Sequence, residues 1–306
     1  MAHSKLAIIH FVIVLLTGLI IHGQERYKDP VFSGIAVETY TYSDTLRLDF
    51  YTGKADSVKG KPLLVLVHGG GFAVGKRDNR LEADFSRDMA KRGYAVASIS
   101  YRLLRKGKSF GCDCPAAEKI NIFLAVSEDI RRAVRYLSDR AETLKFDPEK
   151  IVLIGSSAGA EAVLNTAFMQ YHHRFKALPY PNLSYAAVVS FAGAVMDASY
   201  ITGDNVVPTL LFHGEMDNLV PFGTAAHHNC AANTTGYIVL EGAATIAERI
   251  AALGGSYQLV YDPTGNHDWA NFPYADAGSI SEFIKRTVID GEHLQSRVKI
   301  DKRSDK

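Results

Sequence analysis

The sequence predicts an α/β fold in which helices cover both faces of a mostly parallel central sheet, as a single domain over residues 30–290. Continuous apolar runs typical of buried parallel strands, such as residues 63–68 (LLVLVH), alternate with segments whose apolar residues recur at helical spacing, such as residues 127–137 (SEDIRRAVRYL). No internal repeat, low-complexity tract or long Pro/Gly/Ser-rich linker follows residue 30. Nothing therefore divides this part of the chain into two domains.

Strands and helices are expected to alternate along the whole domain. Two segments of alternating polarity come first, and the later strands are apolar runs separated by amphipathic segments. The order strand, helix, strand makes neighbouring strands parallel. Residues 291–306 are polar, and we expect a solvated tail there. The expected strands are residues 35–41, 46–51, 63–68, 94–100, 151–154, 186–191, 209–213 and 258–261, and the expected helices are residues 82–92, 127–137, a helix that begins at Ala158, 243–253 and 279–289.

The charge balance and the cysteine count exclude several classes of function. The 306 residues include 34 basic and 33 acidic side chains, a formal charge of +1. A protein that binds the phosphate backbone of a nucleic acid needs an excess of basic residues on its surface, and this charge balance shows none. We therefore expect no nucleic-acid partner. Three cysteines are too few for a disulfide-built miniprotein, and none forms a Cys-x-x-Cys pair, so we expect no metal site.

Residues 1–23 have the features of a signal peptide. Lys5 precedes an apolar run over residues 6–21, which is shorter than the about 20 residues that a membrane-spanning helix needs. Cleavage after Gly23 would leave a secreted or periplasmic protein. An uncleaved N-terminal anchor is the alternative, and we expect no other contact with a membrane.

The sharpest motif is the pentapeptide Gly155-Ser156-Ser157-Ala158-Gly159, which lies between an expected strand and an expected helix. A serine hydroxyl is a weak nucleophile unless it is exposed beside a base, and a tight strand-to-helix turn achieves this when its neighbours are small. The G-x-S-x-G pattern therefore makes Ser157 the candidate nucleophile, with Ser156 as a packing or hydrogen-bonding neighbour. The alternative is a tight turn whose small residues only serve helix packing.

A run of glycines, HGGGF at residues 68–72, follows the strand LLVLV. Backbone N–H groups stabilise negative charge on a carbonyl oxygen only where no side chain blocks a close approach. We expect the N–H groups of Gly70, Gly71 and Ala158 to form an oxyanion hole, the last at a helix N-terminus. A flexible loop or a phosphate cradle is the alternative, but FAVGK continues the chain where a Walker loop needs Gly-Lys-Ser/Thr.

Residues from about 60 to 290 resemble the α/β-hydrolase superfamily and are most similar to serine carboxylesterases of the hormone-sensitive-lipase-like and feruloyl or acetyl esterase-like kind. In that family a glycine loop precedes the nucleophile, as HGGGF precedes Ser157 here, and the segment Tyr101-Arg102-Leu103 also fits. Ser156 stands where the family often has an acidic residue.

The resemblance implies an acid and a base after the serine, in the chain order Ser, Asp/Glu, His. Asp217 lies in HGEMDNLVP, residues 213–221, which matches the H-G-x-x-D-x-x-V-P pattern of the resembling enzymes, and Glu215 is the second choice. His267 follows the last expected strand, where the base should lie, with Asp262 nearby as a competing carboxylate. Asp217 would accept the Nδ1 proton of His267 and stabilise the imidazolium.

Aromatic and cysteine side chains are expected near the mouth of the pocket, because their loops lie at the carboxyl ends of strands. Either Cys112 or Cys114 would form a disulfide with Cys230 in an oxidising compartment. For each aromatic residue, the alternative is that its ring only packs against neighbouring loops. The rings expected to bind the acyl or alcohol part of a substrate are Phe72, Phe110, Trp269 and Phe272.

The predicted function is that of a secreted serine carboxylesterase that hydrolyses short-chain acyl or aromatic esters of the acetyl or feruloyl type, through an acyl-enzyme and without a cofactor. The ester would belong to a small molecule or be linked to a polysaccharide. The second hypothesis is a serine peptidase of the prolyl-oligopeptidase-like kind, although the chain has no segment for the large N-terminal propeller usual in that group. The third is an inactive binding protein on a hydrolase scaffold, which typically lacks the serine or the histidine.

Overall fold

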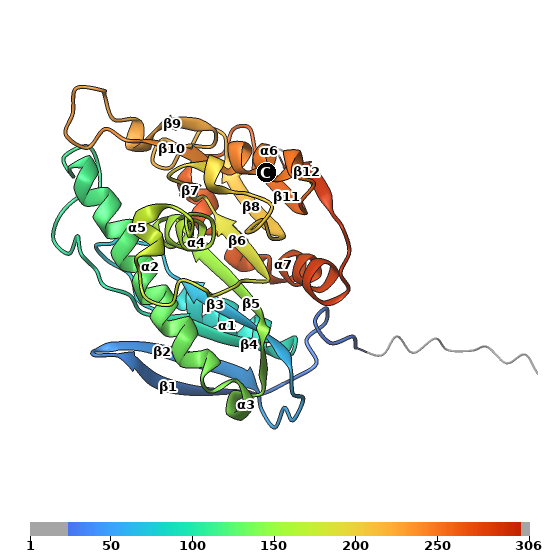
Figure 1. Ribbon diagram of the computed structural model, residues 1–306. Coiled ribbons are helices and arrows are strands. Elements are labelled where there is room, and N and C mark those ends of the chain that lie inside the picture. Colours follow the sequence, from blue (N-terminus) through green and yellow to red (C-terminus); the bar gives the residue numbers. More distant parts are fainter. Residues whose placement is uncertain (1–23, 301–306) are drawn as a thin grey trace, which may run out of the picture.

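The computed structural model describes residues 24–300, and a nine-stranded sheet at its centre confirms the α/β fold (Figure 1). Its strands are β1 (Ile35–Ser43), β2 (Leu46–Gly53), β3 (Lys61–Val67), β4 (Ala95–Ile99), β5 (Phe146–Ser156), β6 (Ala187–Phe191), β8 (Thr209–Gly214), β11 (Tyr257–Asp262) and β12 (Gln295–Lys299). They are ordered β1-β2-β4-β3-β5-β6-β8-β11-β12. β2 pairs antiparallel with β1 and with β4, and all other neighbours are parallel.

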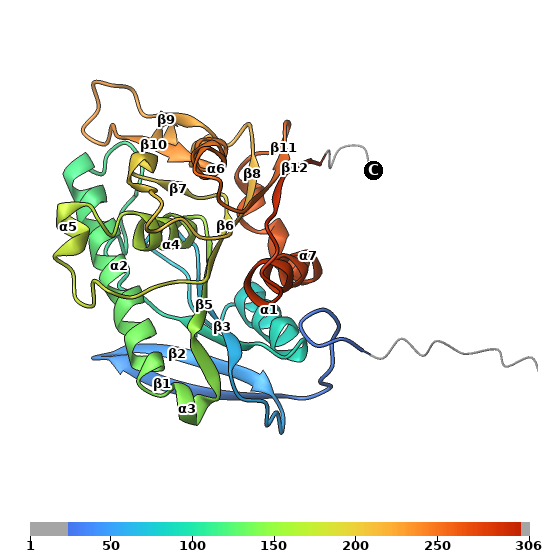
Figure 2. The ribbon, with the colours of Figure 1, turned by 45° about the vertical axis from the view of Figure 1, so that its right-hand side comes forward.

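Helices cover both faces of this sheet (Figure 2). One face, which receives Leu63 and Val65 of β3, packs against α2 (Ala116–Ser138), α4 (Ala158–Phe168) and α6 (Ala243–Ala252). The other face, which receives Leu64 and Leu66, packs against α1 (Arg80–Lys91) and α7 (Ala277–Ile284). Both faces of β3 are therefore buried, which explains its continuous apolar run. Within residues 24–300, no helix is both long and apolar enough to span a membrane.

A second, smaller sheet and several shorter helices complete the fold. A small antiparallel sheet, ordered β7-β10-β9, lies beside the main one. The helix expected over residues 279–289 is split into α7 and a following π-helical turn. The small-sheet strands are β7 (Ala194–Val195), β9 (Thr224–Ala226) and β10 (Val239–Gly242), and the remaining α-helices are α3 (Ala141–Leu144) and α5 (His173–Lys176).

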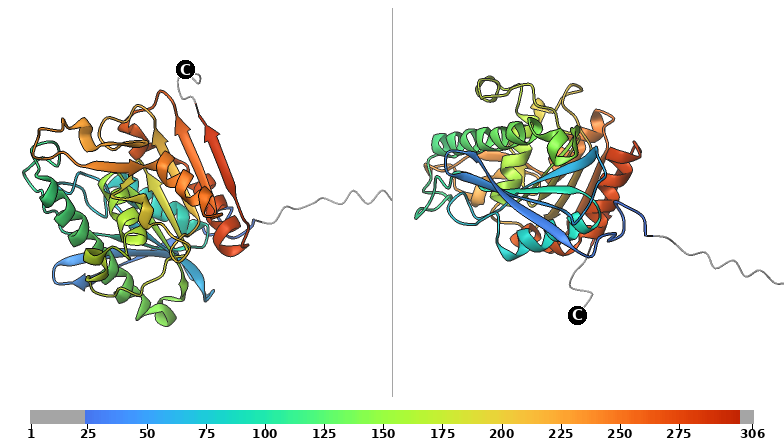
Figure 3. Two further views of the ribbon diagram at one scale, coloured as in Figure 1. Left: turned by 45° about the horizontal axis from the view of Figure 1, so that its top comes forward. Right: turned by 90° about the horizontal axis from the view of Figure 1, so that it is seen from below.

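The ends of the domain differ from the prediction. Residues 291–306 were expected to form a solvated tail, but residues 295–299 form β12, a parallel edge strand beside β11 (Figure 3, left). Four of its five side chains are exposed, so its backbone pairing holds it in place without an apolar pattern. At the other end, Arg26 forms an ion pair with Asp56. The domain therefore extends beyond residues 30–290, and the predicted signal peptide, residues 1–23, lies outside the described residues.

The arrangement of parallel strands places the predicted functional residues at one edge of the sheet. β3, β5, β8 and β11 all run in the same direction, so their carboxyl ends lie at the same edge. The glycine loop follows β3, Ser157 follows β5, Asp217 follows β8 and His267 follows β11.

A disulfide ties two loops together at this edge. Cys112, on the loop before α2, is bonded to Cys230, on the loop before β10, across 118 residues of sequence. This confirms the expected pairing and assigns it to Cys112, because Cys114 is a buried free thiol. Phe110 and His228 each lie two residues before a bonded cysteine, so the disulfide holds both of their loops.

Removal of the disulfide is expected to lower thermal stability without dismantling the sheet. Closing a loop of 118 residues restricts the unfolded chain, and such a bond contributes about 2–4 kcal/mol. In a domain of this size that loss corresponds to a fall of about 5–15 °C in Tm. Differential scanning fluorimetry of Cys112→Ser against the wild type measures it.

The matched control is a reductant. Dithiothreitol should lower the Tm of the wild type to that of Cys112→Ser and leave the variant itself unchanged. Cys114→Ala should still respond to dithiothreitol as the wild type does. A wild-type Tm that is insensitive to reductant would contradict the assigned pairing.

Candidate active site

Ser157 lies in a sharp turn between β5 and α4. Its backbone has φ 50° and ψ −122°, a conformation that strains any residue with a side chain. A Cβ on Gly155 would lie 2.3 Å from the carbonyl oxygen of Gly159, and a Cβ on Gly159 would lie 2.2 Å from that of Val67 in β3. Both glycines of the G-x-S-x-G motif are therefore required by the close approach of the turn, α4 and β3.

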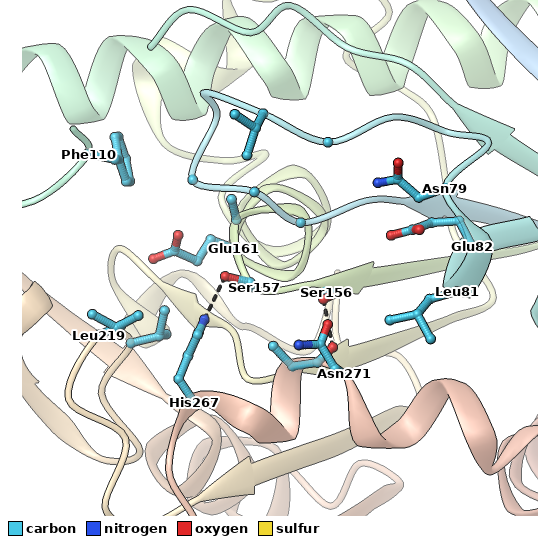
Figure 4. A pocket seen from close by; sticks show the side chains of 18 of the residues that line it. Asn79, Leu81, Glu82, Phe110, Ser156, Ser157, Glu161, Leu219, His267 and Asn271 are labelled. Carbon is cyan, nitrogen blue, oxygen red and sulfur yellow. Dashed lines mark hydrogen bonds between the residues drawn. The ribbon is translucent and has the colours of Figure 1, made fainter. Parts of the chain in front are cut away.

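The turn presents the hydroxyl of Ser157 to a histidine from a distant loop (Figure 4). Ser157 Oγ donates to Nε2 of His267 over 2.8 Å, and Nδ1 of His267 donates to Oδ2 of Asp217 over 2.7 Å. The structure thus brings the three predicted residues together from three separate loops. We call this chain of hydrogen bonds the Ser–His–Asp series.

The loops that carry the acid and the base are in direct contact. Glu215 N–H donates to the carbonyl of Asp262 over 2.9 Å, and a Cβ on Gly214 would lie 2.4 Å from the carbonyl oxygen of Gly265. The glycine of the H-G-x-x-D pattern is therefore needed for this contact. The Glu215 side chain is exposed, and the Asp262 carboxylate accepts hydrogen bonds from Thr264. Neither competing carboxylate contacts the imidazole of the series.

Asp217 is a buried carboxylate with donors on both oxygens. Oδ1 accepts the N–H groups of Leu219 and Val220 over 2.8 and 3.0 Å, and Oδ2, besides accepting from His267, lies 3.3 Å from Nε2 of His213. Burial opposes ionisation of Asp217, but the hydrogen bonds from His213 and His267 outweigh it and hold its pKa well below its usual range. The acid is therefore ionised at neutral pH.

The glycine loop and the start of α4 border the same cavity as Ser157. Val74 N–H donates to the carbonyl of Gly70 over 3.0 Å, which holds the loop in a turn. Within residues 24–300, the N–H groups of Gly70, Gly71 and Ala158 donate to no protein acceptor. These three amides, one of them at a helix N-terminus, are free to bind an anionic oxygen.

A cavity of about 620 Å³ opens over Ser157. Of the four aromatic residues expected to line it, only Phe110 does. Phe72 is fully buried and packs edge-on against Phe110, with ring centroids 4.7 Å apart. Trp269 is buried and Phe272 packs edge-on against it at 5.9 Å, outside the cavity lining. We therefore do not assign Phe72, Trp269 or Phe272 to the pocket.

The cavity also has polar lining residues that sequence reasoning missed (Figure 4). Glu161 lies at one end, and its position four residues after Ser157 places it on the same face of α4. That spacing, together with its being the one charged residue in the helix AGAEAVLNTAF, is the signal that could have identified it. Asn79, Glu82 and Asn271 lie at the other end. In the part of the chain that the structure describes, no group of three or more His, Cys, Asp or Glu side chains is placed to hold a metal ion.

Comparison with known families agrees with this geometry. The model of the BD-FAE family matches residues 48–197, about half of the chain, and this stretch contains both the glycine loop and Ser157. The chain belongs to the BD-FAE family. The resemblance to α/β-hydrolases of the serine carboxylesterase type is therefore confirmed.

Individual relatives of this BD-FAE protein are named as esterases. Carboxylesterase NlhH of Mycobacterium tuberculosis is 28% identical over 247 residues, which are 69% of this chain and 67% of that protein. Gut esterase 1 of Caenorhabditis elegans is 26% identical over 171 residues, 56% of this chain, and the match spans only 27% of that longer protein. A truncated carbohydrate esterase from gut microbiota shares the fold, with a TM-score of 0.57 at 18% identity over 85% of this chain and 98% of that one.

The low pKa of Asp217 makes its contribution to stability dependent on pH. Because the folded-state pKa lies below the ordinary value of 3.8, the ionised carboxylate stabilises the fold above about pH 4, and this contribution is lost as the pH falls toward the folded-state pKa. Asp217→Asn should therefore melt below the wild type at pH 7, and the gap in Tm should shrink between pH 5 and pH 3. Scanning fluorimetry across that range measures the gap.

Glu215→Gln is the control, because its exposed carboxylate lies two residues away and makes no contact with the series. It should melt with the wild type at every pH. A gap for Asp217→Asn that widens toward pH 3 would show that the carboxylate is not held in its ionised form.

Proposed function

We propose that this BD-FAE protein is a serine carboxylesterase. The observation that carries the proposal is the Ser–His–Asp series, which ends at a strained serine beside three free main-chain amides. An ester has the electrophilic carbonyl that such a serine attacks, and two successive acyl transfers use every group in this arrangement.

The first transfer forms an acyl-enzyme. Nε2 of His267 takes the hydroxyl proton of Ser157 while Oγ bonds to the ester carbon, and the carbonyl electron pair moves onto its oxygen. Gly70, Gly71 and Ala158 donate hydrogen bonds to this oxyanion, each such donor being worth about 3 kcal/mol in the transition state. The bond to the alcohol oxygen then breaks, and His267 gives its proton to the leaving alkoxide.

The second transfer releases the acid by the same route. His267 takes a proton from water, and the hydroxide oxygen bonds to the acyl carbon. When the intermediate collapses, Oγ of Ser157 leaves and recovers its proton from His267. Asp217, ionised throughout, fixes the imidazole tautomer and stabilises the imidazolium in both steps. The balance of atoms and electrons requires no oxidant, reductant or metal.

We propose short-chain acyl or aromatic esters as the substrate class, either as small molecules or linked to polysaccharides. The cavity has a volume of about 620 Å³ and is lined at one end by the apolar side chains of Phe110 and Leu219, which suit a small acyl or aromatic group. The names of the relatives, a carboxylesterase and a carbohydrate esterase, support this choice.

Replacement of the serine tests the mechanism. Ser157→Ala should lose at least about 1,000-fold in kcat on p-nitrophenyl acetate while keeping the Tm of the wild type, because the nucleophile is removed and nothing else is disturbed. His267→Ala should lose a similar factor. A panel from p-nitrophenyl acetate to palmitate, with methyl ferulate, measures the acyl preference, which should fall with chain length.

Two controls make this test specific. Ser156→Ala removes only the hydroxyl that donates to the carbonyl of Ala270 over 2.7 Å, and it should keep most of the activity. An aminoacyl anilide distinguishes an esterase from a peptidase. An unchanged kcat in Ser157→Ala would mean that a different residue is the nucleophile. Preferential cleavage of the anilide would favour the hypothesis that the protein is a peptidase.

We also propose that the protein is exported, with residues 1–23 as its signal peptide. The Cys112–Cys230 disulfide supports this proposal, because such bonds persist in oxidising compartments. Expression of the full chain in a host with a general secretory pathway should give mature protein that begins at Gln24. N-terminal sequencing and intact mass measure this. An intact N-terminus in the membrane fraction would instead indicate an uncleaved anchor.

A further inference from the structure

One end of the cavity contains a carboxylate that the proposed mechanism does not use. Glu161 lies one helical turn after Ser157, its side chain is 2% exposed, and it points into the cavity (Figure 4). Phe110 and Leu219 border the same end (Figure 4), and the lining residue His228 has its ring 6.4 Å from that of Phe110. We call these four residues the Glu161 subsite.

The carboxylate has unused capacity to accept hydrogen bonds. Oε1 of Glu161 lies 3.1 Å from Nε2 of His227. Within residues 24–300, no donor forms a well-aligned hydrogen bond to this buried oxygen. An ionised carboxylate offers about four acceptor positions, and a buried one normally has most of them filled. Oε1 is enclosed beside His227, whereas Oε2 accepts no hydrogen bond within residues 24–300 and is not among the enclosed atoms. The open acceptor positions that face the space a substrate would occupy are therefore those of Oε2.

A buried lysine compensates the charge of the carboxylate. Nζ of Lys119 donates to the carbonyl of Gly236 over 2.8 Å and lies 3.2 Å from Nδ1 of His227, whose other nitrogen faces Glu161. Burial and neighbouring positive groups lower the pKa of His228 to about 3, so this lining residue is neutral. The carboxylate of Glu161 thus has the ammonium group of Lys119 behind it, across His227. This arrangement suits a neutral hydrogen-bond donor in the substrate better than a cation.

We propose that Glu161 accepts a hydrogen bond from a hydroxyl group of the substrate, so that the enzyme selects hydroxylated, sugar-like esters over apolar esters of the same size. The inference rests on the proposed esterase function and deepens it. Phe110 and Leu219 supply apolar walls for the carbon skeleton, and the carboxylate supplies the one strong acceptor between them. A substrate that carries its own carboxylate is repelled.

Matched ester pairs test this selection. In each pair one ester carries a hydroxyl where the other carries a methyl group of similar size: 2-hydroxyethyl acetate against propyl acetate for the alcohol part, and ethyl lactate against ethyl isobutyrate for the acyl part. Each kcat/KM is divided by the rate of hydroxide-catalysed hydrolysis of the same ester. We expect the wild type to prefer the hydroxyl ester by about 10-fold or more in one of the pairs.

Two variants assign the preference to the carboxylate. Glu161→Gln removes the charge at nearly constant shape and should reduce the preference several-fold. The double variant Glu161→Leu with Lys119→Met removes the acceptor and its compensating charge together, which avoids an unpaired buried charge, and should abolish the preference. Glu82→Gln, a buried carboxylate at the opposite end of the cavity, is the matched control and should leave the preference unchanged.

The outcomes separate the two proposals. Equal loss on both members of a pair in Glu161→Gln, or no hydroxyl preference in the wild type, would overturn the role of Glu161 while Ser157-dependent ester hydrolysis continued. A larger, Glu161-dependent preference for 2-(trimethylammonio)ethyl acetate over 3,3-dimethylbutyl acetate would overturn the assignment of a neutral donor. Failure of the wild type to hydrolyse any of these esters would instead refute the esterase function.

Discussion

The contact between the start of α4 and the end of β3 is the constraint on which the site depends. At Gly159 the helix backbone comes so close to the carbonyl of Val67 that no side chain fits between them. This contact fixes the glycine loop, which continues from β3, relative to Ala158, which begins α4. The strained backbone of Ser157 follows from the same geometry, since the chain must leave β5 and enter the helix within one residue. The proposed nucleophile and the amides proposed to bind the oxyanion are thereby positioned by backbone packing.

Three buried carboxylates lie in or next to the site, and each is accommodated differently. Asp217 is kept ionised by two imidazoles and two main-chain amides. Glu82 hydrogen-bonds to the hydroxyl of Tyr274, but burial dominates and raises its pKa. Glu161 has a histidine and a buried lysine behind it and open acceptor positions in front. Only the carboxylate of Glu161 is both compensated and open toward the substrate space, and this distinguishes a recognition role from a purely structural one.

The sequence predicts those parts of the molecule in which a local motif marks a place where two backbone segments lie in close contact. Gly159 is required by contact, so the G-x-S-x-G motif identified the serine turn, and strand order then placed the base and the acid at the same edge. Side-chain direction within loops carries no such pattern. Phe72, at the end of HGGGF, and Phe110 are both aromatic loop residues, yet the first is fully buried and the second lines the cavity. The strand β12 escaped prediction because an exposed edge strand pairs through its backbone and needs no alternation of apolar residues.

The proposed reaction and the proposed recognition of substrate therefore depend on different parts of the fold. The Ser–His–Asp series sits at the ends of parallel strands, where the sheet and the glycine contacts hold it. Phe110 and His228, by contrast, lie on loops outside the main sheet, and the disulfide between Cys112 and Cys230 joins those loops two residues away from each. Loops joined by a cross-link lose their shape more easily when it is broken than strand ends do. An oxidising environment would thus support substrate selection more than the chemistry itself, which links the proposed export of the protein to the specificity of its pocket.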